Sequence, residues 1–151
     1  MEFSETTKKY WEAKDWEDLE KVQSFKDLYV IAERVIGRMP RPIIQVCGPI
    51  ATGGLGSIEA NLNAFNETIM KLQAEGFTIF DQMPYEEPMQ KLKTSYPEAE
   101  HLKYILDDFY WPIFNLGLIS AFYFMPNWQT SKGATKEHEK AKQLGVKIVY
   151  L

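Results

Sequence analysis

The sequence is short of cysteine, of long apolar runs and of positive charge, and each shortage excludes a class of protein. Cys47 is the only cysteine among 151 residues, so no intrachain disulfide can form. This suits a reducing compartment, and we expect a cytoplasmic protein. The longest apolar stretch, around residues 116–126, is too short to span a bilayer, which predicts no membrane partner. The first residues have no apolar core, so they do not read as a signal peptide.

The charge pattern excludes two further kinds of site. The formal net charge is -4, and no basic stripe appears, so we expect no duplex nucleic acid as a partner. A small anion remains a plausible ligand, because backbone N–H groups hold anions without any net positive charge. No group of His, Cys and Asp residues has metal-ligand spacing, and we predict no metal site.

The first forty residues have the periodicity of helices. Apolar side chains recur at spacings of three and four, which gives one apolar face. They are Phe25, Leu28, Ala32 and Val35. Gly37 is a stop signal, and Pro40 and Pro42 prevent continuation of the helix. We therefore predict an N-terminal helical extension over residues 1–40, outside the main domain.

From residue 41 onward, short apolar runs alternate with helical patterns. The expected strands are Ile43–Gly48, Phe77–Phe80, the run "LISAFYFM" and the run "VKIVYL". The expected helices run over residues 58–72 and 102–116 and from the loop after Met125 to about Leu144. Residues 81–100 read as a long polar connection with room for a short helix, and Pro112 should kink or shorten the helix at residues 102–116. Alternation of this kind predicts one α/β domain over residues 41–151, with a parallel sheet of four to five strands.

Ligands in such domains bind beyond the carboxyl ends of the strands, which selects the loops after Cys47, Phe80 and Met125. The first of these, "CGPIATGGLGS", is rich in glycine but is neither a Walker A loop nor the dinucleotide fingerprint. Two interpretations are equally open. Its amides approach a ligand, or it is a flexible loop that ends in Ser57 as a helix N-cap.

The loop after Met125 leads into a helix through "PNWQTSKGATKEHEKA". Ser131, Gly133 and Thr135 stand at the helix start, where hydroxyls and N–H groups can hold a phosphate. Glu137 follows in the first or second turn. An acid there is also ordinary, because the helix dipole favours it. The residues alone favour the ordinary interpretation and leave the phosphate site open.

Three stretches together resemble one known family. They are "VCGPI" at the end of the first strand, Asn61 and Phe65 on the next helix, and "MPNWQTSKGATKEHEKAKQLG". These residues resemble the nucleoside 2-deoxyribosyltransferase superfamily, and in particular its DUF4406-type and 2'-deoxynucleoside 5'-phosphate N-hydrolase members. The resemblance covers about residues 43–151. It implies a small flavodoxin- or Rossmann-like domain of three layers.

The resemblance also implies roles for individual residues. Glu137 would be the catalytic carboxylate, and Ser131 would contact a 5'-phosphate. Asp107 or Asp108 would assist by binding the sugar or orienting the nucleophile. The remaining substrate contacts would come from Gly48, Pro49, Ile50, Gly133 and Thr135.

The residues themselves suggest four further candidates and one bystander. Trp128 either stacks on a base or packs on its own helix. Asp81, Glu86 and Glu87 follow the second strand and are candidates to protonate the leaving base, Asp81 also to bind substrate, although a solvated loop charge is commoner. His138 points away from Glu137 around the helix and reads as a surface histidine.

The resemblance implies cleavage or exchange of the N-glycosidic bond of a 2'-deoxynucleoside or its 5'-monophosphate. The expected partner is a small nucleoside or nucleotide, no cofactor is needed, and a homodimer or higher homo-oligomer is expected. The alternative is a nucleotide-binding or sensing module without catalysis. A third alternative is an interaction protein that works through its N-terminal helices.

Overall fold

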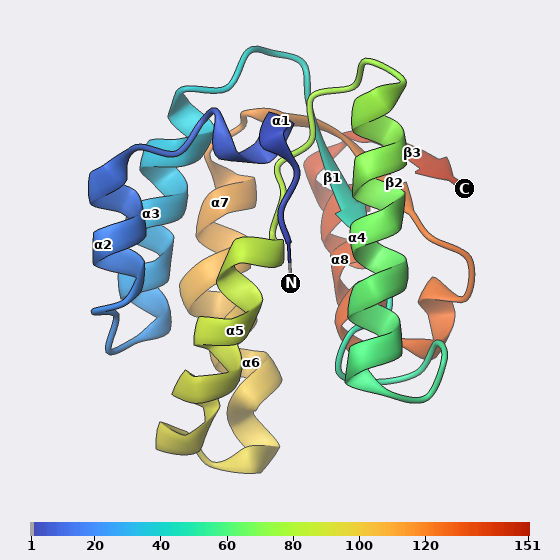
Figure 1. Cartoon of the computed structure of the whole chain (residues 1–151). Helices are drawn as coiled ribbons and strands as arrows, with labels where there is room; N and C mark the ends of the chain where they lie inside the picture. Colours follow the sequence, from blue (N-terminus) through green and yellow to red (C-terminus); the bar gives the residue numbers. More distant parts are fainter. Residues whose placement is uncertain (1) are drawn as a thin grey trace. The chain divides into compact units, whose positions relative to one another are not determined.

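The computed structural model describes residues 2–151, which form two compact units (Figure 1). The helical unit comprises the residues up to Met39 together with Gln82–Leu118. The sheet unit comprises Pro40–Asp81 and Ile119–Leu151. Residues 82–118 thus group with the N-terminal segment, although strands flank them in the sequence. The predicted division into an extension and one α/β domain stays a prediction.

The helical unit is built from short helices around the predicted apolar face. Its helices are α1 (Glu5–Lys8), α2 (Ala13–Leu19), α3 (Phe25–Gly37), α5 (Met83–Leu92), α6 (His101–Ile105) and α7 (Trp111–Asn115), with short 3-10 turns at Lys93–Ser95 and Glu98–Glu100. Helix α3 begins at Ser24, whose hydroxyl accepts a hydrogen bond from the Asp27 N–H. The predicted face of α3 is buried, because Phe25, Leu28, Ala32 and Val35 are each at most 4% exposed.

An ion-pair network joins α2 to α3. The Asp15 carboxylate is buried and lies 3.0 Å from Arg34 Nε and 2.6 Å from Arg38 Nη1. Arg34 also contacts Asp18 at 2.7 Å. A buried carboxylate requires such partners, since an unpaired one would be strongly destabilising.

Two proline-containing segments of the helical unit differ from the sequence patterns. The connection expected at residues 81–100 contains α5, with Pro84 in its first turn, where a missing N–H is harmless. The helix expected at residues 102–116 runs without a break through α6, a π-helical segment at Leu106–Tyr110, and α7. Pro112 lies in the first turn of α7, directly after the π-helical segment, and does not end the helix.

The sheet unit is the α/β part of the chain. It contains β1 (Ile43–Cys47), α4 (Ile58–Ala74), β2 (Ile119–Phe124), a 3-10 turn at Trp128–Thr130, α8 (Lys132–Leu144) and β3 (Lys147–Tyr150). The three strands pair in parallel in the order β1-β2-β3, and Cys47 is in register with Phe124. The expected α/β class and parallel sheet are therefore present.

The sheet has three strands where four to five were expected. The run Phe77–Phe80 forms only an isolated parallel bridge between Ile79 and Ile44. Two hydrogen bonds carry it, from Ile44 N to Thr78 O at 2.9 Å and from Phe80 N to Ile44 O at 3.0 Å. The run is buried like a strand at Ile79 and Phe80, but its ladder is too short to make one.

The order of the strands reverses between β1 and β2. After α4 the chain reaches Ile79 on one side of β1, whereas β2 and then β3 lie on the other side. Figure 1 accordingly shows α4 in front of the strands and α8 behind them. Right-handed crossovers that run in opposite directions place their helices on opposite faces of a sheet.

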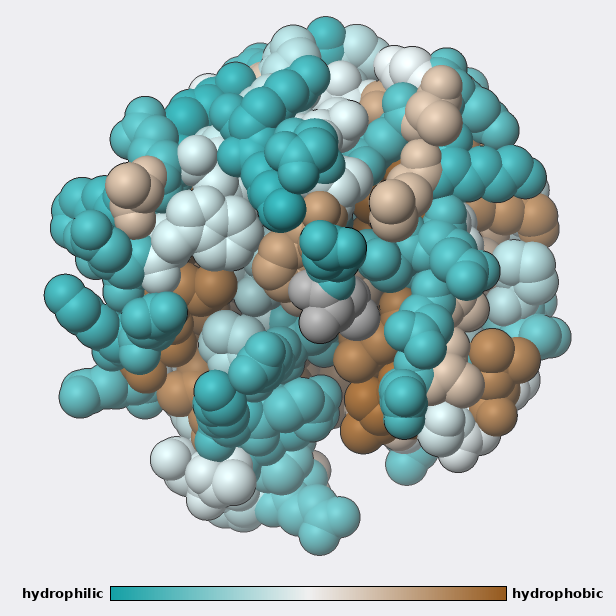
Figure 2. Space-filling view, in the orientation of Figure 1, coloured by the Kyte–Doolittle hydropathy of each residue, from teal (hydrophilic) through white to brown (hydrophobic). Residues whose placement is uncertain are grey.

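On the face of the molecule shown in Figure 2, hydrophilic side chains predominate and apolar ones form patches between them. Exposed large apolar residues include Val30 in α3, Leu55 before α4 and Met70 within it. Scattered exposure of this kind is ordinary for folded domains. Among residues 2–151, no helix has the length and apolar character needed to cross a bilayer.

Candidate functional site

Two loops of the sheet unit meet at the carboxyl ends of β1 and β2. We call residues 48–57 the β1 loop and residues 125–131 the β2 loop. The Met125 N–H donates to Cys47 O at 2.8 Å, and the Gly54 N–H donates to Thr130 Oγ1 at 2.8 Å. Because the strand order reverses between β1 and β2, this is the switch point where ligands of open α/β sheets bind.

Glycine is required where these loops approach each other most closely. A Cβ at Gly48 would lie 2.6 Å from Met125 Sδ, and one at Gly53 would collide with the backbone of Thr130. Gly53 also has a φ of +69°, in the left-handed region that favours glycine. The glycine richness that was noticed in the sequence therefore has a packing explanation.

The β1 loop is held by one buried side chain, Asn61 of α4. Its amide nitrogen donates to Ile50 O at 3.0 Å and Gly53 O at 3.1 Å, and its oxygen accepts from the Leu55 N–H at 2.8 Å. Ser57 caps α4 as expected, accepting from the Ala60 N–H at 3.1 Å. The loop is therefore anchored to α4 at three points, and the predicted approach of its amides to a ligand stays a prediction.

The start of α8 is capped from within the chain. Ser131 is buried, and its hydroxyl accepts a hydrogen bond from the Ala134 N–H at 3.1 Å. Thr135 donates its hydroxyl to Ser131 O at 2.8 Å, and the Lys132 N–H donates to Thr52 Oγ1 at 3.0 Å. Gly133 lies between these residues and is partly buried. A phosphate bound at this turn would have to replace the Thr52 hydroxyl as acceptor of the Lys132 N–H, or accept hydrogen bonds from N–H groups that already have an acceptor.

Glu137 faces the sheet instead of the solvent. It lies in the second turn of α8, whose first turn contains no acidic residue, and it is 7% exposed. Its Oε2 is 3.5 Å from the sulfur of Cys47, the last residue of β1. The carboxylate is thus buried at the carboxyl end of β1, and its favourable interaction with the helix dipole does not by itself explain that burial.

His138 and Trp128 belong to an aromatic cluster beside this site. The two rings stack with centroids 4.2 Å apart, and His138 Nε2 is 2.7 Å from the hydroxyl of Tyr150. Burial, followed by the nearby charge of Lys142, lowers the pKa of His138. His138 was expected at the surface but is buried, because Trp128, Phe124 and Tyr150 cover it. Trp128 packs on its own helix, and its predicted contact with substrate stays a prediction.

The remaining predicted site residues divide between the two units. Asp81 is buried and is the last residue of the segment Pro40–Asp81 of the sheet unit. Pro49 and Ile50 follow Gly48 in the β1 loop. Asp107, which is exposed, and Asp108 lie in the π-helical segment of the helical unit. Their role as assisting carboxylates stays a prediction.

The helical unit buries a carboxylic acid, Glu86, for which the sequence favoured the interpretation of a solvated loop charge. Glu86 of α5 is 5% exposed, and burial raises its pKa to about 7. The Tyr110 hydroxyl donates to Glu86 Oε1 at 3.4 Å. The signal that could have revealed it is the spacing of Met83, Glu86 and Met89, which places the acid on the apolar side of a helix.

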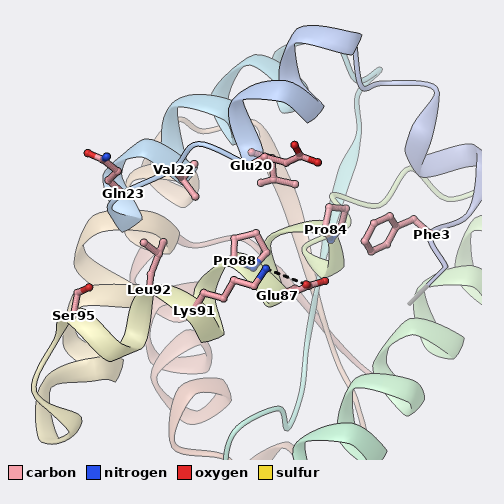
Figure 3. A pocket seen from close by; sticks show the side chains of 11 residues that line it. Phe3, Glu20, Val22, Gln23, Pro84, Glu87, Pro88, Lys91, Leu92 and Ser95 are labelled. Atoms are coloured by element: carbon pink, nitrogen blue, oxygen red, sulfur yellow. Dashed lines mark ion pairs between the residues drawn. The ribbon is translucent and has the colours of Figure 1, made fainter.

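A separate cavity of about 580 Å³ lies in the helical unit (Figure 3). Its apolar lining comes from Phe3, Leu19, Val22, Pro84, Pro88 and Leu92. The ion pair between Lys91 and Glu87, at 3.3 Å, lies at the same cavity. Of the candidate acids after the second strand, Glu87 lines this cavity, whereas none of the residues expected to contact substrate does.

Within residues 2–151, no cluster of three His, Cys, Asp or Glu residues could hold a metal ion.

Comparisons with known proteins give one match. No curated protein and no solved structure matches the chain significantly. The model of one protein family matches residues 44–150, which is most of the chain and includes α4, α8, β2, β3 and all of β1 except its first residue. The chain therefore belongs to the DUF4406 family, which is defined by a domain of unknown function.

Proposed function

We propose that the sheet unit binds a 2'-deoxynucleoside or its 5'-monophosphate and cleaves or exchanges its N-glycosidic bond, with Glu137 as the reacting carboxylate. One observation carries the proposal. Glu137 is buried against the carboxyl end of β1, beside the switch point where the β1 and β2 loops meet. The resemblance of "VCGPI" and of the Ser131–Glu137 stretch to nucleoside deoxyribosyltransferases supports it further.

The chemistry needs a carboxylate in such a place. When the bond between sugar and base breaks, its electron pair leaves with the base, and positive charge develops on the sugar ring. A carboxylate oxygen stabilises that charge or forms a bond to the anomeric carbon. Water then releases the sugar, whereas a second base accepts it in a transfer reaction. In the buried surroundings of Glu137, the attraction between carboxylate and developing cation is stronger than in water.

The two loops supply the binding surfaces in this proposal. Gly48, Pro49 and Ile50 border the base and sugar, and Asn61 keeps that part of the loop in place. The turn from Ser131 to Thr135 contacts the sugar hydroxyl or the 5'-phosphate. Ser131 already caps α8 and Thr135 already donates to Ser131 O. A phosphate bound there would therefore form hydrogen bonds with groups that also hold the start of the helix.

The experiment is a release assay with a matched control. The protein is incubated with deoxynucleosides, deoxynucleoside monophosphates, ribonucleotides and NAD, and free base is measured by chromatography. We expect release from a deoxy substrate that is lost in Glu137→Gln and retained in Glu139→Gln. Glu139 is an exposed acid on the same helix, so its variant controls for the change in charge.

Other outcomes distinguish the alternatives. Thermal stabilisation by a nucleotide without release of base would overturn catalysis and favour a binding or sensing module. Release that persists in Glu137→Gln would exclude Glu137 as the reacting group. Neither release nor stabilisation with any compound would overturn the proposed function altogether.

A further inference from the structure

The single cysteine of the chain touches the carboxylate that we propose as reactive. Cys47 is the last residue of β1 and is fully buried, in register with Phe124 of β2. Its sulfur lies 3.5 Å from Glu137 Oε2, although ninety residues separate the two along the chain. This distance is within the range of a hydrogen bond that involves sulfur.

The direction of this hydrogen bond follows from the two groups. An ionised carboxylate only accepts hydrogen bonds, whereas a thiol donates one as long as it keeps its proton. Burial, followed by the negative charge of Glu137, raises the pKa of Cys47 well above its ordinary value. The sulfur therefore keeps its proton near neutral pH, and the S–H group donates a hydrogen bond to the Glu137 carboxylate.

One such donor matters for a glutamate more than for a stiffer side chain. The terminal torsion of glutamate is broad and has no sharp preferred angle. A donor fixed on the backbone of a buried strand selects one orientation of the carboxylate plane. A carboxylate that must approach the anomeric carbon gains from such fixed orientation, because reaction requires close and aligned atoms.

We infer that Cys47 is a positioning residue, whose thiol orients the Glu137 carboxylate for the reaction at the carboxyl end of β1. The inference rests on the proposed function for its catalytic consequence. The contact itself does not rest on it, so the two are tested separately. Cys47 forms no covalent bond and transfers no electrons in this role.

The first test observes the thiol without any assay of activity. Since the chain has one cysteine, its S–H stretching band in the infrared spectrum reports on Cys47 alone. We expect the band at lower frequency in the wild-type protein than in Glu137→Leu, and unchanged in Glu139→Gln. Glu137→Gln, which keeps a weaker acceptor of similar size, should give an intermediate position and serves if Glu137→Leu does not fold. An S–H band at the same frequency in all four proteins would overturn the inference.

The second test separates positioning from packing. With the deoxy substrate that releases base, we expect Cys47→Ala to lower kcat about ten-fold or more, as loss of a hydrogen bond to a charged group implies, while KM changes less than about two-fold. Cys47→Ser retains a donor and should restore kcat to within about three-fold of the wild type. A purely structural role would give equal losses in the alanine and serine variants, or a loss that follows their melting temperatures.

The results for the two proposals remain distinguishable. If the wild-type protein releases no base, the proposed function fails, and the infrared shift still decides whether the thiol and the carboxylate are bonded. If base release depends on Glu137 but Cys47→Ala keeps the full kcat, the proposed function stands and the positioning role is overturned.

Discussion

Each compact unit buries a glutamate, and the two units hold it in different ways. In the sheet unit, Glu137 lies at a strand end, beside two loops whose backbone and hydroxyl groups are hydrogen-bonded to each other. In the helical unit, Glu86 lies within the packed helices, and Tyr110 donates to it at 3.4 Å. The first is at the position where open α/β sheets bind ligands, and the second is in a core.

The difference teaches that burial of a carboxyl group is not by itself a sign of a reactive site. A raised pKa would select Glu86 as the functional candidate, because perturbed groups cluster at active sites. The position at the strand ends selects Glu137 instead. We therefore expect substitution of Glu137 to change activity and substitution of Glu86 to change stability.

The largest expected effect is on the rate in Glu137→Gln. Loss of the reacting carboxylate should reduce the release of base roughly a thousand-fold or more. Glu86→Gln, in the same assay and at one pH where both proteins are folded, should keep a rate within a few-fold of the wild type. A large loss of rate in both variants, with melting temperatures unchanged, would remove the distinction between the two glutamates.

The second effect is the pH dependence of stability that Glu86 introduces. The folded pKa of about 7 lies above the ordinary value of 4.5, so the folded protein holds this proton more tightly than the unfolded chain does. The corresponding stability is present below about pH 4.5 and is lost as the pH rises through 7. The difference corresponds to roughly 3 kcal/mol in the free energy of unfolding.

Denaturation of wild type and variants at pH 5 and pH 8 measures this effect. Glu86→Gln should lose most of the pH dependence attributable to the acid, whereas Glu87→Gln should keep it. Glu87 is the exposed neighbour in the same helix, which makes it the matched control. An identical pH dependence in Glu86→Gln and wild type would show that Glu86 is not the group responsible.

The third effect concerns the polar network on which the sheet-unit site depends. Asn61→Ala removes three hydrogen bonds to the β1 loop and should lower the free energy of unfolding by about 2 kcal/mol. It should also raise KM, because the loop is then no longer held beside the substrate. Asn63→Ala, at an exposed position of the same helix, is the control. Unchanged stability and KM in Asn61→Ala would mean that the loop does not need this anchor.

The smallest effect compares two helix caps. Ser131→Ala and Ser57→Ala should each lower stability by about 1 kcal/mol, since each removes an N-cap hydrogen bond. Only Ser131→Ala should also lower the affinity for ligand. If this turn contacts the phosphate, the affinity for nucleotides should fall more than the affinity for nucleosides. Isothermal titration with both ligand types measures this. Equal weakening of both would count against phosphate recognition.

The sequence was informative where neighbouring residues decide the structure. The apolar face of α3, the cap at Ser57, and the runs that form β1, β2 and β3 all follow from local spacing. It was less informative at residues 77–80 and 81–100. There a short strand-like run makes only one bridge, and a polar, proline-containing segment becomes α5, because packing overrides local preference.

The sequence by itself determined that Glu137 stands on a helix after a strand, and that glycines fill the loop after β1. Only the tertiary structure decided that this acid is buried against Cys47 and that the two loops share hydrogen bonds. The physical reason is distance along the chain. Helix caps and periodic faces involve residues within a few positions of each other, whereas the thiol and the carboxylate are ninety residues apart. The contact forms because β1 and β2 pair in parallel, and the chain that leaves β2 enters α8, which places Glu137 beside the end of β1.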